Sequence, residues 1–180
     1  YDTGMITVIE IMGRHAGWLA GAAALATCCG SGPDLVYLPE VDFDMDKFVA
    51  DVEAIYNKTG KVLIAVSEGI HYADGSFVSE AKTSATDGFG HAQLGGLAVR
   101  LANTLKERTG AKVRGIELSL LQRCGAHLAS ETDLNEAVEA GRLAVEAAVA
   151  GETGKMVAFE RNDVDGKYVC EMTLIPLESV

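Results

Sequence analysis

Apolar and polar positions along the chain fall into blocks that alternate between the period of a strand and the period of a helix. Residues 61–67 form a nearly continuous apolar run, which is typical of a strand buried on both faces of a parallel sheet. Other runs are rich in β-branched and apolar residues. Together these runs predict strands at residues 6–12, 34–38, 61–67, 113–118, 156–159 and 168–174.

Between these strands, apolar residues recur at helical spacing and predict four helices. The first covers residues 15–28 and the second covers residues 44–57. The third has an apolar stripe from Leu94 to Leu105 and ends at Gly110. The fourth opens at Asp133, which forms a capping box with Glu136, and runs to Gly151. The polar residues 71–87 predict a loop.

Strands that alternate with helices of this length predict an α/β fold, a three-layer domain with a mostly parallel sheet. No internal repeat, low-complexity segment or linker interrupts the pattern. We therefore expect a single domain over residues 1–180.

Composition narrows the classes of partner. Hydrophobic residues make up 48% of the chain, which is enough for a core. The formal net charge of −11 argues against nucleic acid and anionic membranes as partners. No apolar run reaches the roughly 18 residues of a membrane span, and the polar opening residues predict no signal peptide. Four cysteines without zinc-site spacing predict buried, reduced thiols in a cytoplasmic protein: Cys28, Cys29, Cys124 and Cys170.

In parallel sheets, ligands bind beyond the carboxyl ends of the strands, so the residues that follow each strand are the first candidates. Met12-Gly13-Arg14 follows the first strand and precedes a helix. The glycine allows close backbone approach, the helix start offers N–H donors, and the arginine adds positive charge, which favours a phosphate-sized anion. The tripeptide alone also fits a glycine turn with a surface arginine.

Two further strand ends carry charged residues. Glu68 follows the buried strand, where its carboxylate can accept hydrogen bonds from sugar hydroxyls, although a helix cap or a loop acid fits too. Arg114 and Arg123 flank the next strand, and Gln122-Arg123 supplies donors suited to phosphate. As a bare pair, the arginines also fit a solvated surface. The histidines show no metal-binding spacing, so we predict no metal site within the chain.

Taken in order, these segments resemble the phosphofructokinase family. The strongest similarity lies in residues 8–20, around Met-Gly-Arg. Pro39-Glu40-Val41, residues 65–69 (Ala-Val-Ser-Glu-Gly) and residues 121–123 (Leu-Gln-Arg) follow at the family's intervals. Four blocks in register across most of the chain make this resemblance specific.

The resemblance implies a phosphofructokinase-like fold and the sugar-phosphate-binding half of a 6-phosphofructokinase. That enzyme phosphorylates fructose 6-phosphate to fructose 1,6-bisphosphate in glycolysis. Carried over, Met12 and Gly13 would line the sugar site, and Arg14 would face the reacting end as the catalytic residue. Glu68 would bind sugar hydroxyls, and Arg123 would bind the 6-phosphate.

Other residues complete the implied substrate-binding set. Arg114 matches an arginine that the family donates to a neighbouring subunit, which implies a homo-oligomer. Leu120, Leu121 and Gln122 lead into Arg123. Leu120 stands where the familiar bacterial ATP enzymes of the family have a histidine, and Met5 stands where they have an arginine. Contacts to the 6-phosphate are therefore expected to differ from theirs.

The segments around Trp18 and Cys124 resemble the pyrophosphate-using branch of the family. The lysine-rich stretch that forms the effector site of the ATP enzymes carries less charge here, at residues 57–61. The family's Gly-Gly-Asp donor loop and its Thr-Ile-Asp block, which holds the general base, do not occur in these residues. We expect them upstream of Tyr1, with the Mg²⁺ that accompanies the donor, and we expect this chain alone to be inactive.

Three alternatives stay open at this point. The donor can be ATP, since the donor loop lies outside these residues. The chain can also belong to a non-catalytic regulatory subunit that binds a sugar phosphate. An unrelated nucleotide-binding α/β domain is disfavoured, because no strand–GxGxxG–helix segment occurs.

Overall fold

The structure is a computed structural model that describes residues 4–79 and 96–180. Its contacts divide the chain into two compact units, Tyr1–Cys124 and Gly125–Val180. The division arises because the elements after Cys124 contact mainly one another. That the whole chain behaves as a single domain stays a prediction.

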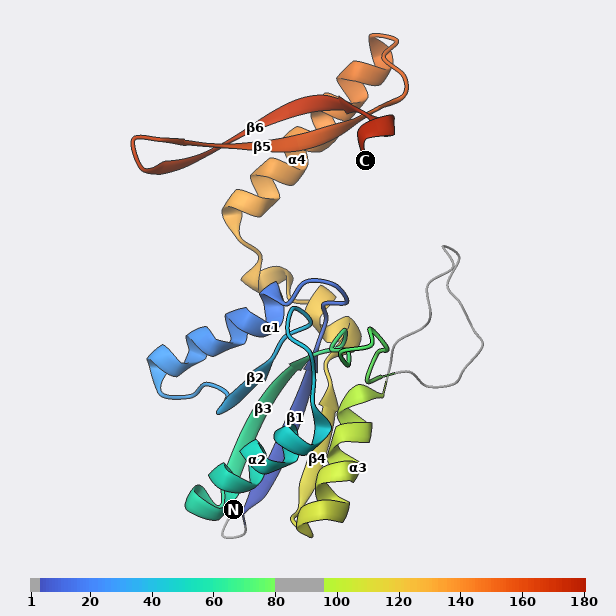
Figure 1. The fold of residues 1–180 in the computed structure, drawn as a ribbon. Coiled ribbons are helices and arrows are strands. Elements are labelled where there is room, and N and C mark those ends of the chain that lie inside the picture. Colours follow the sequence, from blue (N-terminus) through green and yellow to red (C-terminus); the bar gives the residue numbers. More distant parts are fainter. Residues whose placement is uncertain (1–3, 80–95) are drawn as a thin grey trace. The chain divides into compact units, whose positions relative to one another are not determined.

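The first unit is built on a four-stranded sheet in the order β2-β3-β1-β4 (Figure 1). Every pair of neighbouring strands is parallel, as the alternating pattern predicted. Each strand lies within one residue or so of its predicted place. Their bounds are β1 Met5–Ile11, β2 Leu35–Tyr37, β3 Lys61–Ser67 and β4 Val113–Glu117.

Helices of the first unit follow the predicted order, with one change. Residues 15–28, predicted as one helix, contain a short α-helix, α1 (Trp18–Ala22), followed by a 3-10 helix, η1 (Ala23–Cys29). Helices α2 (Met45–Thr59) and α3 (Leu97–Thr109) agree with the prediction.

The ends of α2 show why its sequence predicts it well. The side chain of Asp44 accepts a hydrogen bond from the Lys47 amide at 2.8 Å and so caps the first turn. Gly60 ends the helix in the left-handed conformation, with φ of 72°. Local residues therefore determine both ends of this helix.

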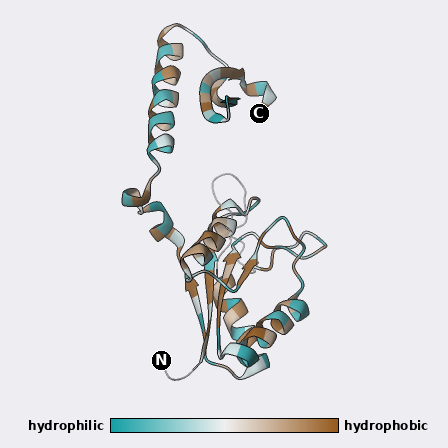
Figure 2. Cartoon of the chain, turned by 90° about the vertical axis from the view of Figure 1, so that its left-hand side faces the viewer, coloured by the Kyte–Doolittle hydropathy of each residue, from teal (hydrophilic) through white to brown (hydrophobic). Residues whose placement is uncertain are grey.

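Helices cover both faces of the sheet, which gives the three layers that the pattern predicted (Figures 1 and 2). Along β1, Ile6 and Val8 are buried in the core cluster that includes α2 and α3 residues. Ile11 is buried on the other face with Ala20 of α1. Because successive side chains of a strand point to opposite faces, one apolar run supplies both layers of the core.

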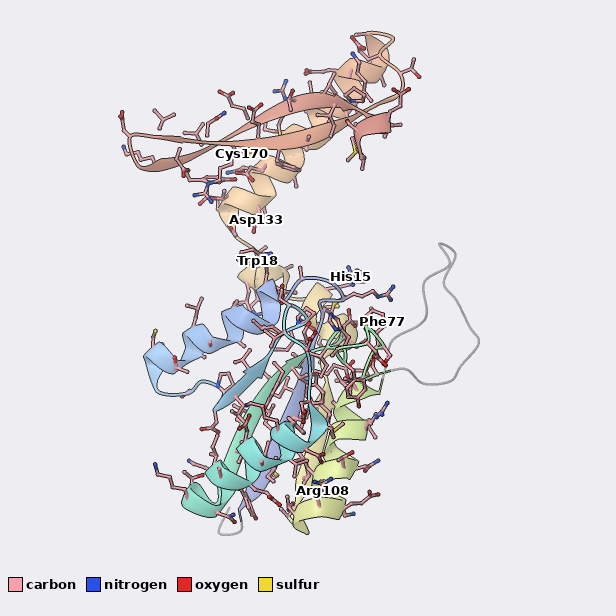
Figure 3. All side chains as sticks on the ribbon, in the orientation of Figure 1. His15, Trp18, Phe77, Arg108, Asp133 and Cys170 are labelled. Atoms are coloured by element: carbon pink, nitrogen blue, oxygen red, sulfur yellow. The ribbon has the colours of Figure 1, made fainter. Side chains whose placement is uncertain are left out.

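The predicted loop at residues 71–87 is described as far as residue 79. There His71 and Phe77 form an isolated antiparallel bridge around the turn at Gly75. The ring of His15 lies 6.1 Å from that of Phe77, so this loop lies beside the turn after β1 (Figure 3). Residues 80–87 of the predicted loop, and Leu94 of the predicted helix stripe, lie outside the described residues.

The second unit contains α4 (Glu131–Val149) and the antiparallel pair β5 (Lys155–Val164) and β6 (Lys167–Pro176). The two strands are longer than predicted, because Asp165 and Gly166 form a two-residue turn in which both have positive φ. It also contains two short 3-10 helices, η3 (Ala126–Leu128) and η4 (Leu177–Ser179), whereas η2 (Ser119–Arg123) ends the first unit.

The predicted cap of the last helix is wrong. Ser130, and not Asp133, is the cap residue, since its hydroxyl oxygen accepts a hydrogen bond from the Asp133 amide at 3.3 Å. Asp133 instead lies in the first turn, where its negative charge interacts favourably with the positive end of the helix dipole. The helix therefore begins at Glu131, two residues before the predicted start.

The predicted burial of the cysteines is also wrong. Cys28, Cys29 and Cys124 are exposed and Cys170 is partly buried, and all four are free thiols. The three exposed ones lie at the ends of the 3-10 helices η1 and η2, where few neighbours cover a side chain. Separately, no helix within residues 4–79 and 96–180 is long and apolar enough to span a membrane.

Candidate functional site

Three neighbouring strands of the first unit end at the same edge of its sheet. Ile11 of β1 pairs with Ser67 of β3, and Glu10 pairs with Glu117 of β4. The segments that follow these strands are therefore brought together. They are the turn at residues 12–14, the turn at residues 68–69, and η2. This meeting of strand ends is what the sequence predicted for its candidate residues.

Side chains from the end of β3, from the residue that follows it and from η2 hold the turn after β1. The amide of Met12 donates to Oε1 of Gln122 at 2.8 Å, and the amide of Gly13 donates to Oε1 of Glu68 at 3.2 Å. The hydroxyl of Ser67 donates to the carbonyl oxygen of Gly13. Three side chains thus bind the backbone of two consecutive residues, so this turn has little freedom to move.

Two glycines allow this close arrangement. Gly13 has φ of 143°, and a Cβ atom there would lie 2.6 Å from the Ala16 carbonyl oxygen. A Cβ atom on Gly69 would lie 1.8 Å from the carbonyl oxygen of Arg14, so the backbones of the two turns are in contact. The amide of Gly69 also donates to the Gly13 carbonyl oxygen at 3.1 Å. Sequence reasoning identified Gly13 but assigned no role to Gly69.

A cavity of about 130 Å³ lies at this meeting point. Four of the predicted residues line it: Met12, Glu68, Leu120 and Arg123. Four residues without a predicted role also line it: Glu10, Ile11, Glu117 and Ser119.

Glu10 is a buried acid at this cavity that the sequence analysis missed. Its side chain is only 4% exposed, and its Oε2 accepts a hydrogen bond from the Ala98 amide at 2.8 Å. This bond caps the start of α3, because the cap residue Gly96 has no side chain to do so. A single acid within the apolar run of residues 8–11 was the available signal.

Burial raises the pKa of the Glu10 carboxyl above its ordinary value, and the nearby carboxylates of Glu117 and Glu68 raise it further. The hydrogen bond from Ala98 acts in the opposite direction, because it stabilises the charged form. Burial is the largest of these effects, so Glu10 binds its proton more tightly than an exposed glutamate does.

The remaining predicted residues differ in their placement. Arg14 is partly buried beside Gly69. Leu120 and Leu121 are 70% and 71% exposed, and Leu121 does not line the cavity. Arg114 is not brought to the site, because it pairs with Thr7 near the start of β4.

The charges around the cavity suit a ligand with both hydroxyl and anionic groups. The carboxylates of Glu10, Glu68 and Glu117 can accept hydrogen bonds from hydroxyls but would repel a phosphate. The guanidinium of Arg123, which is exposed, offers several donors in a geometry that fits a phosphate. Within the described residues, no group of three His, Cys, Asp or Glu side chains is arranged to hold a metal ion.

Comparison with known proteins decides the family. The family model described as phosphofructokinase matches residues 3–148, which is most of the chain. The chain belongs to the phosphofructokinase family. The resemblance seen in the four sequence blocks is thereby confirmed.

Relatives within the phosphofructokinase family carry the name pyrophosphate–fructose 6-phosphate 1-phosphotransferase. The protein from Halomonas elongata is 44% identical over 176 residues, which cover 97% of this chain and 41% of the relative. The protein from Xanthomonas campestris pv. campestris is 42% identical over 179 residues, covering 97% of this chain and 42% of the relative.

Solved structures agree with the fold. A pyrophosphate-dependent phosphofructokinase from Marinobacter aquaeolei superposes with a TM-score of 0.73 and 31% identity, over 99% of this chain and 40% of that protein. The phosphofructokinase-like α/β fold predicted from sequence is confirmed. The chain spans about two fifths of the length of these relatives.

Proposed function

We propose that this chain is the sugar-phosphate-binding portion of a 6-phosphofructokinase that uses pyrophosphate as its phosphoryl donor. The observation that carries the proposal is the cavity at the strand ends, where Glu68, Arg123 and Met12 meet. The names of the relatives from Halomonas and Xanthomonas support both the sugar phosphate and the donor.

In this proposal, the carboxylate of Glu68 has two functions. One oxygen accepts a hydrogen bond from the Gly13 amide and so holds the turn. The other is available to accept a hydroxyl of fructose 6-phosphate, since a carboxylate has about four lone-pair sites. Arg123 binds the 6-phosphate from the rim of the cavity by charge-assisted hydrogen bonds. Leu120, which also lines the cavity, provides a contact without charge beside it.

Arg14 is the proposed catalytic residue. It follows the clamped Met12-Gly13 turn directly, so its position is set by that turn. Phosphoryl transfer develops charge on the migrating group, and an arginine held in place stabilises that charge without reorganising. The general base, the donor loop and the Mg²⁺ bound with the donor would belong to the part of the relatives that this chain does not cover.

The proposal extends to assembly and location. Arg114 lies on β4, away from the cavity in its own chain, as is expected of a residue that serves a neighbouring subunit. We therefore propose a homo-oligomer with shared sites, acting in glycolysis in the cytoplasm.

The test is an assay of the intact polypeptide that contains this chain. With fructose 6-phosphate and Mg²⁺ present, pyrophosphate should yield fructose 1,6-bisphosphate at a rate at least about tenfold above that with ATP. The 180-residue chain alone should show no turnover with either donor. A clear preference for ATP would refute the proposed donor while leaving the sugar substrate in place.

An absence of turnover with both donors, together with calorimetric binding of fructose 6-phosphate, would favour the alternative of a non-catalytic regulatory subunit. Turnover by the 180-residue chain alone would contradict the division of roles proposed here.

A further inference from the structure

Gln122 links two segments that lie 110 residues apart in the sequence. It belongs to η2, which also carries Arg123, and its Oε1 accepts the amide of Met12 at 2.8 Å. Met12 begins the turn that carries Arg14. The bond therefore joins the two segments that hold the arginines proposed for the two ends of the substrate.

Several features make η2 dependent on this bond. It is a short 3-10 helix of five residues, and Leu120 and Leu121 within it are largely exposed, so apolar packing holds it weakly. Ser119, at its start, has φ of 42°, which is unfavourable for a residue other than glycine. A strained and thinly packed element needs specific bonds to keep one position.

The orientation of the Gln122 amide follows from its partner. A backbone N–H can only donate, so the atom that faces Met12 must be the amide oxygen. A glutamate would also supply an acceptor, but it would bring a further carboxylate against Met12, which lines a cavity that already holds Glu10, Glu68 and Glu117. A neutral amide provides the bond without further repelling a phosphate.

We infer that Gln122 is a positioning residue, whose bond to the Met12 amide sets the spacing between the turn that carries Arg14 and the 3-10 helix that carries Arg123. This inference rests on the proposed function. It assigns Gln122 a role other than the direct substrate contact that the family resemblance implied.

The role has a kinetic consequence. Catalysis by fixed charges depends on alignment, and a misplacement of about 1 Å can lower a rate by about 100-fold. Losing the bond would let η2 and the turn move apart, while each arginine kept its charge. The transition state, which needs both arginines aligned at once, would suffer more than ground-state binding. A direct contact to substrate would instead weaken binding and raise KM.

The experiment uses the intact polypeptide with three variants. Gln122→Met keeps the side-chain length without an acceptor, and we expect kcat to fall about tenfold or more while KM for fructose 6-phosphate changes less than about threefold. Gln122→Glu keeps the acceptor and should retain kcat within about threefold, with a raised KM from its added charge. Asn162→Leu, an exposed change on β5, controls for loss of a polar group and should leave both constants within about twofold.

Hydrogen exchange at the Met12 amide gives a second readout that needs no turnover. Exchange should be faster in Gln122→Met and near wild type in Gln122→Glu. If Gln122→Met fails to fold, as judged by circular dichroism, Gln122→Asn replaces it. That variant has the same amide on a shorter side chain and should show the same loss of kcat.

The outcomes separate the two proposals. A raised KM with unchanged kcat in Gln122→Met, or unchanged Met12 exchange, would overturn the positioning role in an otherwise active enzyme. A failure of Gln122→Glu to restore kcat would do the same. A wild-type polypeptide without phosphofructokinase turnover would refute the proposed function itself, and the positioning role with it.

Discussion

At the carboxyl end of the sheet in the first unit, a recess of about 130 Å³ is lined by charged side chains from three strand ends. At the amino ends of β1 and β3 lies an open hollow of about 870 Å³, whose charged lining residues, among those that the structure describes, are Asp34 and Lys61. The hollow is larger, but none of its described lining residues is an arginine. Asp34 also uses a carboxylate oxygen to accept the Leu63 amide at 2.7 Å.

The comparison shows that size does not identify the site. A ligand with a phosphate needs converging donors and positive charge to offset its loss of water. Such groups meet at the carboxyl end, because η2 and the turn after β1 follow neighbouring parallel strands. The amino end receives mainly helix ends and glycine turns, such as Thr59-Gly60, which offer space and little charge.

The largest effects are expected from substitutions of the two arginines proposed to act at the carboxyl end of the sheet. In the intact polypeptide, Arg14→Ala should lower kcat about 100-fold or more, because it removes charge where charge develops in the transition state. Arg123→Ala should mainly raise KM for fructose 6-phosphate, by about tenfold or more, because it removes a contact made in ground and transition states alike. Steady-state kinetics measure both constants.

Arg108→Ala is the matched control for this pair. Arg108 is an exposed arginine near the end of α3, where it pairs with Asp46 at 3.0 Å (Figure 3). Its loss should change kcat and KM by less than about twofold, because exposed ion pairs contribute little. If Arg14→Ala and Arg123→Ala also leave the kinetics within about twofold, the site is assigned wrongly.

A smaller expected effect is a difference in stability between alanine substitutions of two glycines, one at each end of the sheet. Gly13→Ala should lower the free energy of unfolding by about 2–4 kcal/mol, since the new Cβ would meet the Ala16 carbonyl oxygen in an unfavourable backbone conformation. Gly60→Ala should cost only about 1 kcal/mol, because no atom lies within 4 Å of its Cβ position and the left-handed conformation alone is penalised.

Urea unfolding of both variants, followed by circular dichroism, measures this difference. Equal losses in the two variants would show that the turn after β1 is not as tightly held as the structure indicates. That result would contradict the inference that the side chains of Glu68, Ser67 and Gln122 hold this turn in place.

The smallest expected effect is the response of the reaction rate to effectors that would bind at the amino end of the sheet. ADP or phosphoenolpyruvate should change the rate of the intact enzyme by less than about twofold at subsaturating fructose 6-phosphate. An effector phosphate needs several positive charges, and Lys61 is the one cationic side chain among the described residues that line the hollow. Sigmoidal kinetics relieved by ADP would contradict this prediction and give the amino end a regulatory role.

Much of the fold follows from the amino-acid sequence alone. The apolar run at residues 61–67 predicts β3 with the bounds that the structure shows. Asp44 and Gly60 mark the ends of α2, because a cap and a stop act on their own neighbours. Where two local signals compete, sequence reasoning fails. Ser130 and Asp133 are both good caps, and the prediction took the wrong one.

Sequence alone therefore determined the order of elements, the parallel sheet and the strand ends at which Met12, Glu68 and Arg123 lie, because periodicity and turn residues are local properties. Tertiary structure decided which groups those residues face. Glu10 meets the start of α3, and Gln122 meets Met12, through contacts that span 88 and 110 residues. Such partners depend on which strands become neighbours in the sheet, and no spacing within a single segment contains that information.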